Sequence, residues 1–478
     1  MNTDNVPEKT VVDPEPERKL IRGLQPRHLQ LIVLGGIIGS GYFLGTGYVI
    51  ERAGPAAALA YMLGGIIVFC VMLCLGELSV AAPVSGSFIH YATNFISPTW
   101  GCGVGWSYWL TWVAYVPSEM IAAGWIMNIF FPMVGAVWWS MLFAAIVTLI
   151  NVGKVGAFGE IEFWLSLIKI LAIMMFITIA SCVYLGLIGS HPVDVPSIFS
   201  STEAFFPKKP IAVLLTMVMV LVNFQGTEIV GIAAAESQEP RKVVPVVIRN
   251  IVWRIIFLYV VPLLLLVIIY PWQKVGIESS AFAEALGYYG FQWASGIFSF
   301  VILTAAISCS SSGLYSCSRA MWTLAREGMA PRWLSKLNHN NVPQNAALLS
   351  VTVCWIGILL NTLGGGFEEV YTKLLALSGF SGAITWISIC WSQLKFRRKL
   401  IKNGHYDELK FKTPLFPYLT HFTIWIQVFC LVLMAFDKEL VVSLYVGIPL
   451  LLLPMIWYKL WAKKKYGRNF HKLSHRPV

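Results

Sequence analysis

Long apolar runs recur along the whole sequence, and they restrict the chain to folds that a lipid bilayer can hold. A run of about 20 apolar residues is long enough to cross the hydrocarbon core as a helix. Hydrophobic residues make up 57% of the chain and charged residues only 12%, whereas a soluble domain carries about a quarter charged residues. We therefore predict an all-α polytopic membrane protein. The twelve predicted spans are residues 28–50, 56–80, 100–130, 135–152, 160–188, 211–236, 246–271, 292–318, 345–362, 370–392, 415–436 and 441–461.

Basic residues are distributed unevenly between alternate connections. The net charge of +11 could indicate a nucleic-acid partner, but the positive-inside rule explains it better, because most Lys and Arg fall on one side if the N-terminus is inside. The segments assigned to the outside hold only Arg52, Lys208, Lys209, Lys274 and Lys438. We therefore expect a cell inner (cytoplasmic) membrane protein surrounded by lipid, with both termini cytoplasmic and no nucleic-acid partner.

Polar segments divide the chain into five parts. Residues 1–27 contain no apolar run, so we expect a disordered cytoplasmic tail rather than a signal peptide. Residues 28–392 hold spans 1–10, residues 393–414 form a basic cytoplasmic loop, residues 415–461 hold spans 11 and 12, and residues 462–478 form a second tail. The nine cysteines lie in or beside spans without metal-ligand spacing, so we expect packing residues and no metal.

A glycine-rich stretch interrupts the first span. Residues 35–47 read GGIIGSGYFLGTG, and each interior glycine costs a helix about 1 kcal/mol relative to alanine. We expect the helix to break here, and in a bilayer the freed backbone groups must line a cavity or bind a ligand. Amide groups around Gly39, Ser40 and Gly41 at a half-helix N-terminus suit a carboxylate. A glycine seam for close helix packing is the alternative.

The sixth span carries a matching interruption. Residues 222–228 read VNFQGTE, and carbonyl groups near Phe224 and Gln225 suit an ammonium group. Both breaks together match an α-amino acid, and broken helices at corresponding positions of two halves indicate a transporter site at the midplane. Spans 1–5 and 6–10 are therefore predicted to form an inverted repeat with discontinuous helices 1 and 6. The predicted substrate-binding residues are Ile37, Gly39, Ser40, Gly41, Glu119, Phe224, Gln225, Gly226 and Thr227.

Lys169 lies near the middle of span 5. Inserting a lysine at a helix centre costs about 3 kcal/mol, so a function is expected. A lysine buried in apolar surroundings can exchange its proton near neutral pH. Alternatively, its ammonium takes the place of a coupling sodium ion, or it binds carbonyl groups of a broken helix.

Two carboxylates also fall inside spans. Glu228 follows the break in span 6 and could pair with span 1 or gate the inner pathway, and Glu119 faces either the substrate side chain or a neighbouring helix. Hydrogen-bonded packing is the alternative for both. Hydroxyl groups of span 8 could bind sodium or the substrate carboxylate, although serine in a span more often bonds its own helix. These hydroxyls belong to Ser308, Ser311 and Ser312.

The sequence contains no phosphate-binding glycine loop, nucleophile triad or metal cluster. This pattern argues against a membrane enzyme or an ATP-driven pump. We expect no cofactor, with a proton gradient as the energy source.

Several motifs resemble bacterial amino acid permeases of the amino acid–polyamine–organocation superfamily. They are residues 35–41 with Phe43 and Gly45, residues 83–87 (PVSGS), residues 224–228 (FQGTE) and residues 236–240 (ESQEP). The resemblance runs from about residue 20 to residue 460. Residues 45–48, 72–78 and 95–98 look most like the S-methylmethionine permease branch. One departure is at residues 311–315 (SSGLY), where relatives commonly have an asparagine in first place.

The resemblance implies a leucine-transporter-like fold of five plus five helices with two extra helices, and amino acid import, usually by proton symport. It also implies that Gly39, Ser40 and Gly41 hold the substrate carboxylate and that backbone near Phe224 holds the amine. Lys169 matches a lysine that stands where sodium would otherwise sit, and Glu228 matches a glutamate that couples substrate and gate. An exchanger without ion coupling, a sodium symporter and a substrate sensor remain alternatives.

Overall fold

The computed structural model describes residues 38–84, 86–152, 155–193, 197–233, 240–276, 279–338, 341–360 and 366–462. Within these ranges the ordered elements are helices, and no strand occurs. The α-helices are α2 (Thr46–Ala53), α3 (Ala57–Ala81), α4 (Ser87–Tyr91), α5 (Pro98–Phe130), α6 (Ala136–Val152), α7 (Val155–Tyr184), α8 (Thr202–Phe205), α9 (Ile211–Leu215), α10 (Met217–Val222), α11 (Ile229–Ala233), α12 (Pro240–Ile255), α13 (Val261–Ile269), α14 (Ala281–Tyr288), α15 (Trp293–Arg326), α16 (Gln344–Leu360), α17 (Phe367–Lys402), α18 (Tyr418–Leu433) and α19 (Val441–Trp457). Short π-helical turns are Gly41–Gly45, Ala92–Ile96, Ile256–Val260 and Tyr458–Ala462, and 3₁₀ turns are Gly54–Ala56, Trp272–Lys274, Arg332–Ser335, Tyr406–Glu408 and Met434–Phe436.

Eight of the described helical segments are long and apolar enough to cross a membrane. Two shorter apolar helices, Ala136–Asn151 and Gln344–Leu359, lie where spans 4 and 9 are predicted. Spans 1 and 2 fall in the one segment Gly41–Ala81, and span 6 is divided into short pieces. The chain is thus a helical polytopic membrane protein, while the full set of twelve spans and the inverted repeat stay predictions.

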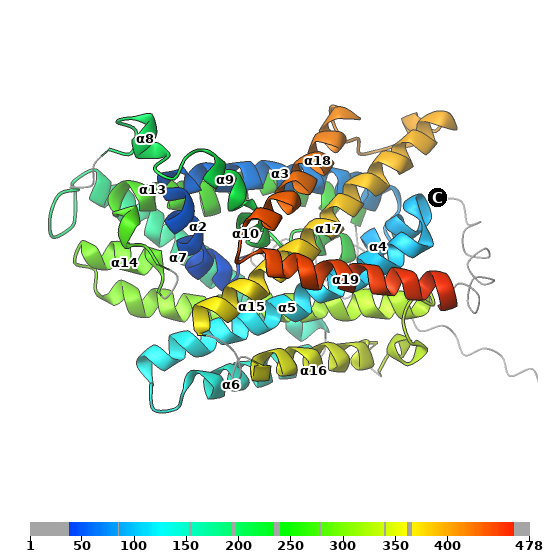
Figure 1. The fold of residues 1–478 in the computed structure, drawn as a ribbon, viewed down its shortest axis with the longest axis horizontal. Coiled ribbons are helices and arrows are strands. Elements are labelled where there is room, and N and C mark those ends of the chain that lie inside the picture. Colours follow the sequence, from blue (N-terminus) through cyan, green and yellow to red (C-terminus); the bar gives the residue numbers. More distant parts are fainter. Residues whose placement is uncertain are drawn as a thin grey trace, which may run out of the picture.

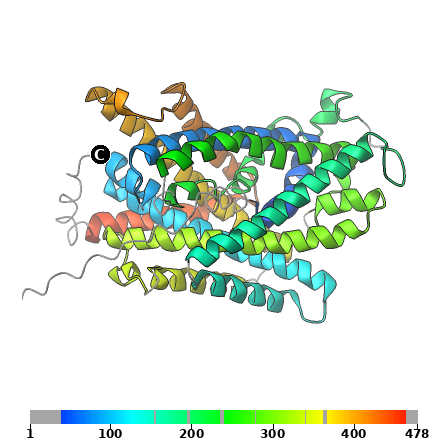
Figure 2. The same ribbon diagram turned by 180° about the vertical axis from the view of Figure 1, so that it is seen from behind.

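Helix α5 is the central element of the bundle. Ser97 caps its N-terminus by accepting a hydrogen bond from the Trp100 amide over 3.2 Å, and Pro98 occupies the first turn, where a missing N–H is tolerated. α5 packs against both α15 and α17; α15 runs along the long direction of the molecule, and α17 crosses it obliquely (Figure 1). Seen from behind, α7 crosses the bundle diagonally over α15 (Figure 2).

The two predicted interruptions lie at the centre of this bundle. Ile38 and Gly39 are not helical, the next residues form the π-helical turn, and Gly54 with φ of 62° redirects the chain from α2 into α3. In the sixth predicted span, α10 ends at Val222 and a series of turns leads to α11. Gly226 has φ of 102°, which a residue with a side chain rarely adopts. Residues before 38, including Ile37, lie outside the described residues.

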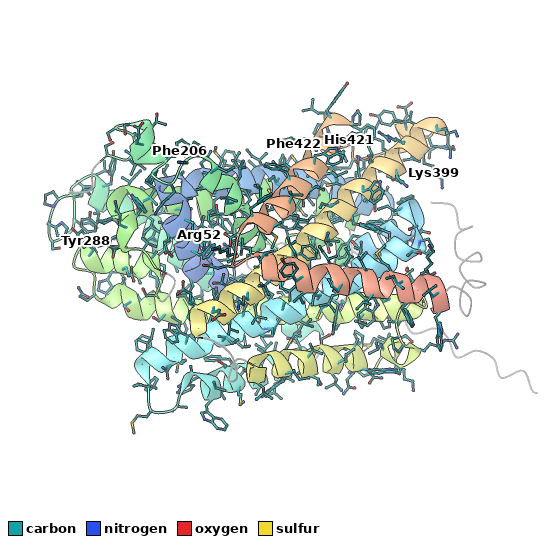
Figure 3. All side chains as sticks on the ribbon, in the orientation of Figure 1. Arg52, Phe206, Tyr288, Lys399, His421 and Phe422 are labelled. Carbon is teal, nitrogen blue, oxygen red and sulfur yellow. The ribbon has the colours of Figure 1, made fainter. Side chains whose placement is uncertain are left out.

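Buried aromatic rings pack beside the first interruption. The Tyr42 ring lies 4.7 Å from that of Tyr259 and 5.4 Å from that of Phe282, and Phe224 also packs on Tyr259. Side chains fill the interior, as Figure 3 shows, with Phe206 and Tyr288 at one end of the bundle and Lys399 at the other. The interruption therefore lies under a layer of aromatic packing.

The tenth predicted span extends further than expected. α17 continues to Lys402, ten residues beyond the predicted end at 392, so the first part of the predicted basic loop is helical. Arg397 lies on this extension, is buried, and donates hydrogen bonds to Glu77 and to the Thr413 carbonyl.

Candidate functional site

The break of the first span binds a carboxylate group of the protein itself. The backbone N–H of Ser40 donates a hydrogen bond to Glu119 Oε2 over 2.9 Å, and both residues are fully buried. Tyr371 of α17 lies alongside, with its hydroxyl 3.4 Å from Ser40 Oγ. Glu119 therefore faces the break rather than lipid, and the amide at the break is positioned to bind a negative charge.

Polar atoms surround the two glycines that flank Ser40. A Cβ atom on Gly39 would lie 2.3 Å from the Tyr115 hydroxyl and 2.6 Å from Glu119 Oε1, and one on Gly41 would lie 2.6 Å from Asn223 Oδ1. Glycine is therefore needed here so that oxygen atoms can approach the backbone. Most of the nearest neighbours are oxygens from other helical segments, so these contacts fit a polar site as well as the close helix packing that was the alternative.

Two of these oxygens lack a well-placed hydrogen-bond donor. Glu119 Oε1 and Asn223 Oδ1 are both buried and accept no hydrogen bond of normal geometry among the described residues, although the Tyr115 hydroxyl also acts on the Glu119 carboxylate. The amide nitrogen of Asn223 is engaged, since it donates to the Tyr61 hydroxyl over 2.6 Å and to the Met219 carbonyl over 3.2 Å. A buried acceptor without a donor is costly, so these two oxygens are the strongest local indication of a ligand donor.

The break of the sixth span is held mainly by its own residues and by α17. Gln225 donates from Nε2 to the Ser378 carbonyl over 2.9 Å and accepts from Ser378 Oγ over 2.7 Å. Thr227 Oγ1 donates to the Phe224 carbonyl over 2.9 Å. In this conformation, then, the side chains of Gln225 and Thr227 are directed to structural partners, and the Phe224 carbonyl already accepts a hydrogen bond.

Glu228 joins the same break to α17. The Gly226 amide lies 3.2 Å from Glu228 Oε1 and 3.1 Å from Oε2, and Trp386 Nε1 donates to Oε2 over 3.1 Å. The carboxylate is buried. Of the two roles predicted for Glu228, pairing with span 1 involves a span whose residues 28–37 lie outside the described residues.

Lys169 belongs to a buried polar cluster that includes a residue not predicted from the sequence. Its Nζ donates to Ser308 Oγ over 2.8 Å, and Ser308 Oγ donates to Glu162 Oε1. Glu162 lies seven residues before Lys169, which is two helical turns on the same face of α7. This spacing could have predicted that Glu162 lies near Lys169. Glu162 is, however, next to the predicted start of span 5 at residue 160, where a charged residue is common.

The hydroxyl groups of span 8 do not bond their own helix as expected. Ser308 is engaged with Lys169 and Glu162, the Ser312 hydroxyl acts on the Glu162 carboxylate, and the Ser311 hydroxyl has no hydrogen-bond partner among the described residues. The favoured expectation, that these serines bond their own helix, was therefore wrong for all three. Among the described residues, no group of three or more His, Cys, Asp or Glu side chains is placed to hold a metal ion.

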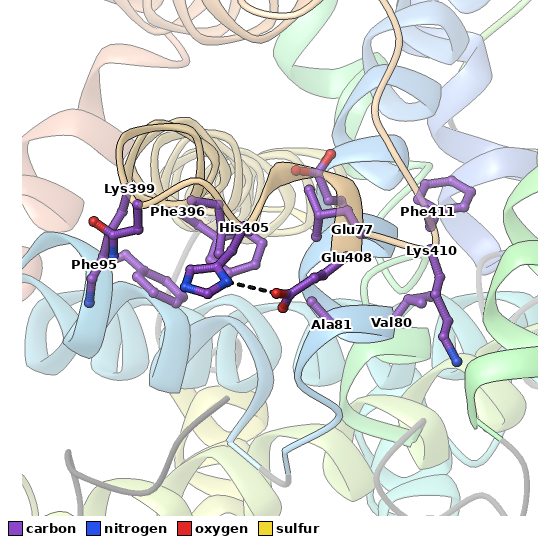
Figure 4. Close-up of a pocket in the computed structure, with 13 residues that line it drawn as sticks. Glu77, Val80, Ala81, Phe95, Phe396, Lys399, His405, Glu408, Lys410 and Phe411 are labelled. Atoms are coloured by element: carbon purple, nitrogen blue, oxygen red, sulfur yellow. Dashed lines mark hydrogen bonds and ion pairs between the residues drawn. The ribbon is translucent and has the colours of Figure 1, made fainter.

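A separate pocket lies at the end of the bundle that carries Lys399. It has a volume of about 470 Å³ and lies between the end of α3, the turn Ala92–Ile96 and the end of α17 (Figure 4). His405 Nδ1 and Glu408 Oε1, 2.6 Å apart, lie within it. On its wall, Glu77 accepts from Arg397 Nε over 2.7 Å, and both side chains are buried.

Comparison with known proteins gives consistent matches over most of the chain. The family model described as "Amino acid permease" matches residues 28–469. Amino-acid permease RocC of Bacillus subtilis is 40% identical over 458 residues, covering 95% of this chain and 97% of that protein. Amino-acid permease RocE of the same organism is 41% identical over 456 residues, covering 94% and 97%. The lysine-specific permease LysP of Escherichia coli is 35% identical over 483 residues, covering 95% and 98%.

Proposed function

The chain belongs to the amino acid permease family, and from this premise we propose that it imports an amino acid by proton symport in an alternating-access cycle. Its relatives are permeases, which are transporters and not enzymes, so the family indicates amino acid transport by a multi-pass membrane protein. The proposal extends this to the coupling ion, the twelve-span inverted-repeat architecture and cytoplasmic termini.

The observation that carries the proposal is the hydrogen bond between Ser40 and Glu119. An amide at a helix break that binds one carboxylate can bind another. In the proposed cycle, the α-carboxylate of the substrate takes over the amides around Gly39, Ser40 and Gly41. Glu119 is then released from Ser40 and becomes a binding group for the positive end of the substrate.

The unpartnered acceptors support a positively charged ligand. Glu119 Oε1 and Asn223 Oδ1 lie over Gly39 and Gly41 and lack well-placed donors. The donors of an ammonium group would satisfy them, and an additional positive charge on the substrate would add to the charge of Lys169 that already acts on Glu119. We infer a cationic amino acid as the substrate class, which includes lysine and the sulfonium compound S-methylmethionine that the sequence motifs suggested. A neutral amino acid is the second candidate.

The position of Lys169 supports protons over sodium. Its ammonium lies 2.8 Å from Ser308 Oγ, one of the hydroxyls considered as a sodium ligand. A fixed positive charge at that position repels a metal cation. The gradient that drives uptake is therefore proposed to be the proton gradient.

Uptake into proteoliposomes tests the coupling. Purified protein is reconstituted with no substrate inside, and uptake of radiolabelled lysine is followed under an imposed pH gradient without sodium. We expect accumulation that collapses when a protonophore is added. Uptake that follows a sodium gradient and ignores pH would favour the sodium symporter, and uptake only into vesicles preloaded with substrate would favour the exchanger.

A ligand screen tests the substrate class. A ligand that binds the folded protein raises its unfolding temperature, so a thermal-shift panel of the proteinogenic amino acids and S-methylmethionine ranks candidates directly. Lysine, arginine, ornithine and S-methylmethionine are expected to stabilise the protein more than leucine or glutamate. The largest shift from a neutral amino acid would exclude the proposed role of Glu119 as the group that binds the additional charge.

A further inference from the structure

The buried cluster on α7 contains a complete chain of hydrogen-bonding groups. Glu162, Ser166 and Lys169 are spaced four and three residues apart, which places them on one face of the helix. All three are buried, and Ser166 Oγ lies 3.4 Å from Glu162 Oε1. Ser308 on α15 connects the two charges, as a donor to Glu162 and an acceptor from Lys169. A carboxylate and an ammonium are thus linked through a single hydroxyl.

One carboxylate oxygen of this cluster, Glu162 Oε2, can still accept a hydrogen bond or a proton. Glu162 Oε1 receives the hydroxyl groups of Ser308 and Ser166, whereas Oε2 is buried and makes no hydrogen bond of normal geometry among the described residues, with the Ser312 hydroxyl the nearby donor to the carboxylate. An ammonium carries its full number of protons and cannot accept another. A proton that enters the cluster therefore binds the carboxylate, and Oε2 is the available acceptor.

We propose that the coupling proton is held by the Glu162–Ser308–Lys169 cluster, with Glu162 as the group that takes it up and releases it. The inference rests on the proton symport proposed above and assigns the proton to a residue outside the predicted set. Uptake forms one O–H bond at Glu162 with a proton delivered by water, and release breaks the same bond without electron transfer. Lys169 acts as the counter-charge, so the protonated cluster carries one positive charge and the deprotonated cluster none.

Neighbouring ionisable groups are few. Glu119 of α5 and Cys309 of α15 interact electrostatically with Lys169. Of the other helices packed on α7, α13 has no ionisable side chain, and Glu284 of α14 is bonded to Ser279 and Tyr270. Tyr259, in the π-helical turn before α13, interacts electrostatically with Arg254. Glu119 therefore links the cluster to the substrate site, because substrate binding that moves Glu119 changes the charge facing Lys169.

Glu162→Gln is the direct test, with Glu160→Gln on the same helix as the matched control. Proteoliposomes are assayed with lysine, or with the amino acid that the thermal-shift panel identifies, while the membrane potential is clamped at zero. Three quantities are measured: exchange without a gradient, accumulation under a pH gradient of one unit, and proton entry reported by a trapped pH dye. One proton per substrate supports about tenfold accumulation under this gradient.

We expect Glu162→Gln to exchange substrate like the wild type but to lose accumulation and proton entry, while Glu160→Gln retains all three. Wild-type accumulation by Glu162→Gln would overturn the inference and leave proton symport intact. A wild-type protein that exchanges substrate without responding to the pH gradient would overturn both. If the Gln variant does not fold, Glu162→Asp replaces it: a shifted pH profile of accumulation supports the inference, and an unchanged profile overturns it.

Discussion

Ser40 and Glu119 are joined by a hydrogen bond of 2.9 Å between a backbone amide at the first helix break and a carboxylate in the middle of α5. The two residues are 79 positions apart in the sequence, and each is fully buried. This contact closes the space between the broken helix and α5. Glu119 can therefore bind either of two partners, the Ser40 amide or a bound cation.

Glu119→Gln distinguishes binding of the Ser40 amide from binding of a cation. A glutamine oxygen can still accept from Ser40, so we expect the protein to fold with little loss of stability. The loss of the negative charge should weaken binding of a cationic amino acid at least about tenfold, which corresponds to about 1.4 kcal/mol. Isothermal titration with lysine measures this, with Glu51→Gln at the exposed end of α2 as the control. Unchanged lysine affinity would falsify a direct role for Glu119.

Gly39→Ala tests the close approach of polar groups to the break. The added Cβ would lie 2.3 Å from the Tyr115 hydroxyl and 2.6 Å from Glu119 Oε1, so the neighbours must move, at a cost of about 1–3 kcal/mol. We expect a lower unfolding temperature and loss of ligand-induced stabilisation. Gly45→Ala is the control, because its Cβ would meet the nearest atom at 3.7 Å. Equal behaviour of the two variants in the thermal-shift assay contradicts the prediction.

The sequence predicted local features of this site better than its partners. The polar interruption at residues 222–228 was visible because amides, a glycine and a carboxylate are out of place in an apolar run, and Gly226 has the positive φ that such a break requires. Lys169 was visible because a charge at mid-span is costly. By contrast, Gln225 is paired with Ser378, 153 positions away, and nothing in either segment alone specifies that contact.

Glu162 and Arg397, at the ends of predicted spans, also have partners that the sequence did not predict. A charge near a predicted boundary is ordinary in sequence, because it can reach the interface. Glu162 is buried where α15 packs on α7, and Arg397 is buried against Glu77 and the Thr413 carbonyl. Hydropathy locates spans, but it does not reveal which charged residues at their ends turn inward.

Breaking the ion pair of Glu77 and Arg397 by removing one partner is predicted to destabilise the protein strongly. Both side chains are almost completely buried, and Glu77 also accepts from the Thr413 amide over 2.7 Å. Removing one partner of a buried pair costs about 3–5 kcal/mol, because the other charge is left unpaired. We expect a markedly lower unfolding temperature for Arg397→Met, and partial recovery in the double variant Glu77→Gln/Arg397→Met.

The exposed pair of Glu369 and Lys373 on α17 provides a control for this ion pair. Exposed pairs contribute about 0.3–0.5 kcal/mol, so Lys373→Met should leave the unfolding temperature almost unchanged. A similar small effect of Arg397→Met would show that solvent reaches Glu77 in solution.

Trp386→Phe tests the link between the sixth-span break and α17. The change removes the indole N–H that binds Glu228 Oε2, while the two contacts from the Gly226 amide remain. A hydrogen bond to a charged group contributes about 1.5–3 kcal/mol, so we expect a loss of stability in this range. Trp391→Phe, on the half-buried part of the same helix, is the control. Thermal unfolding of both variants in detergent gives the comparison.

Lys169→Ala should disable proton coupling while leaving the substrate site intact. Without the ammonium, a charged Glu162 would be buried without its counter-charge, which costs about 3–5 kcal/mol. The carboxylate therefore holds a proton permanently, and the cycle of uptake and release stops. We expect substrate binding and exchange to persist, because Ser40 and Glu119 are unchanged, while accumulation under a pH gradient is lost. Lys373→Ala is the control for a lysine outside the cluster, and accumulation by Lys169→Ala at the wild-type level would remove Lys169 from the coupling mechanism.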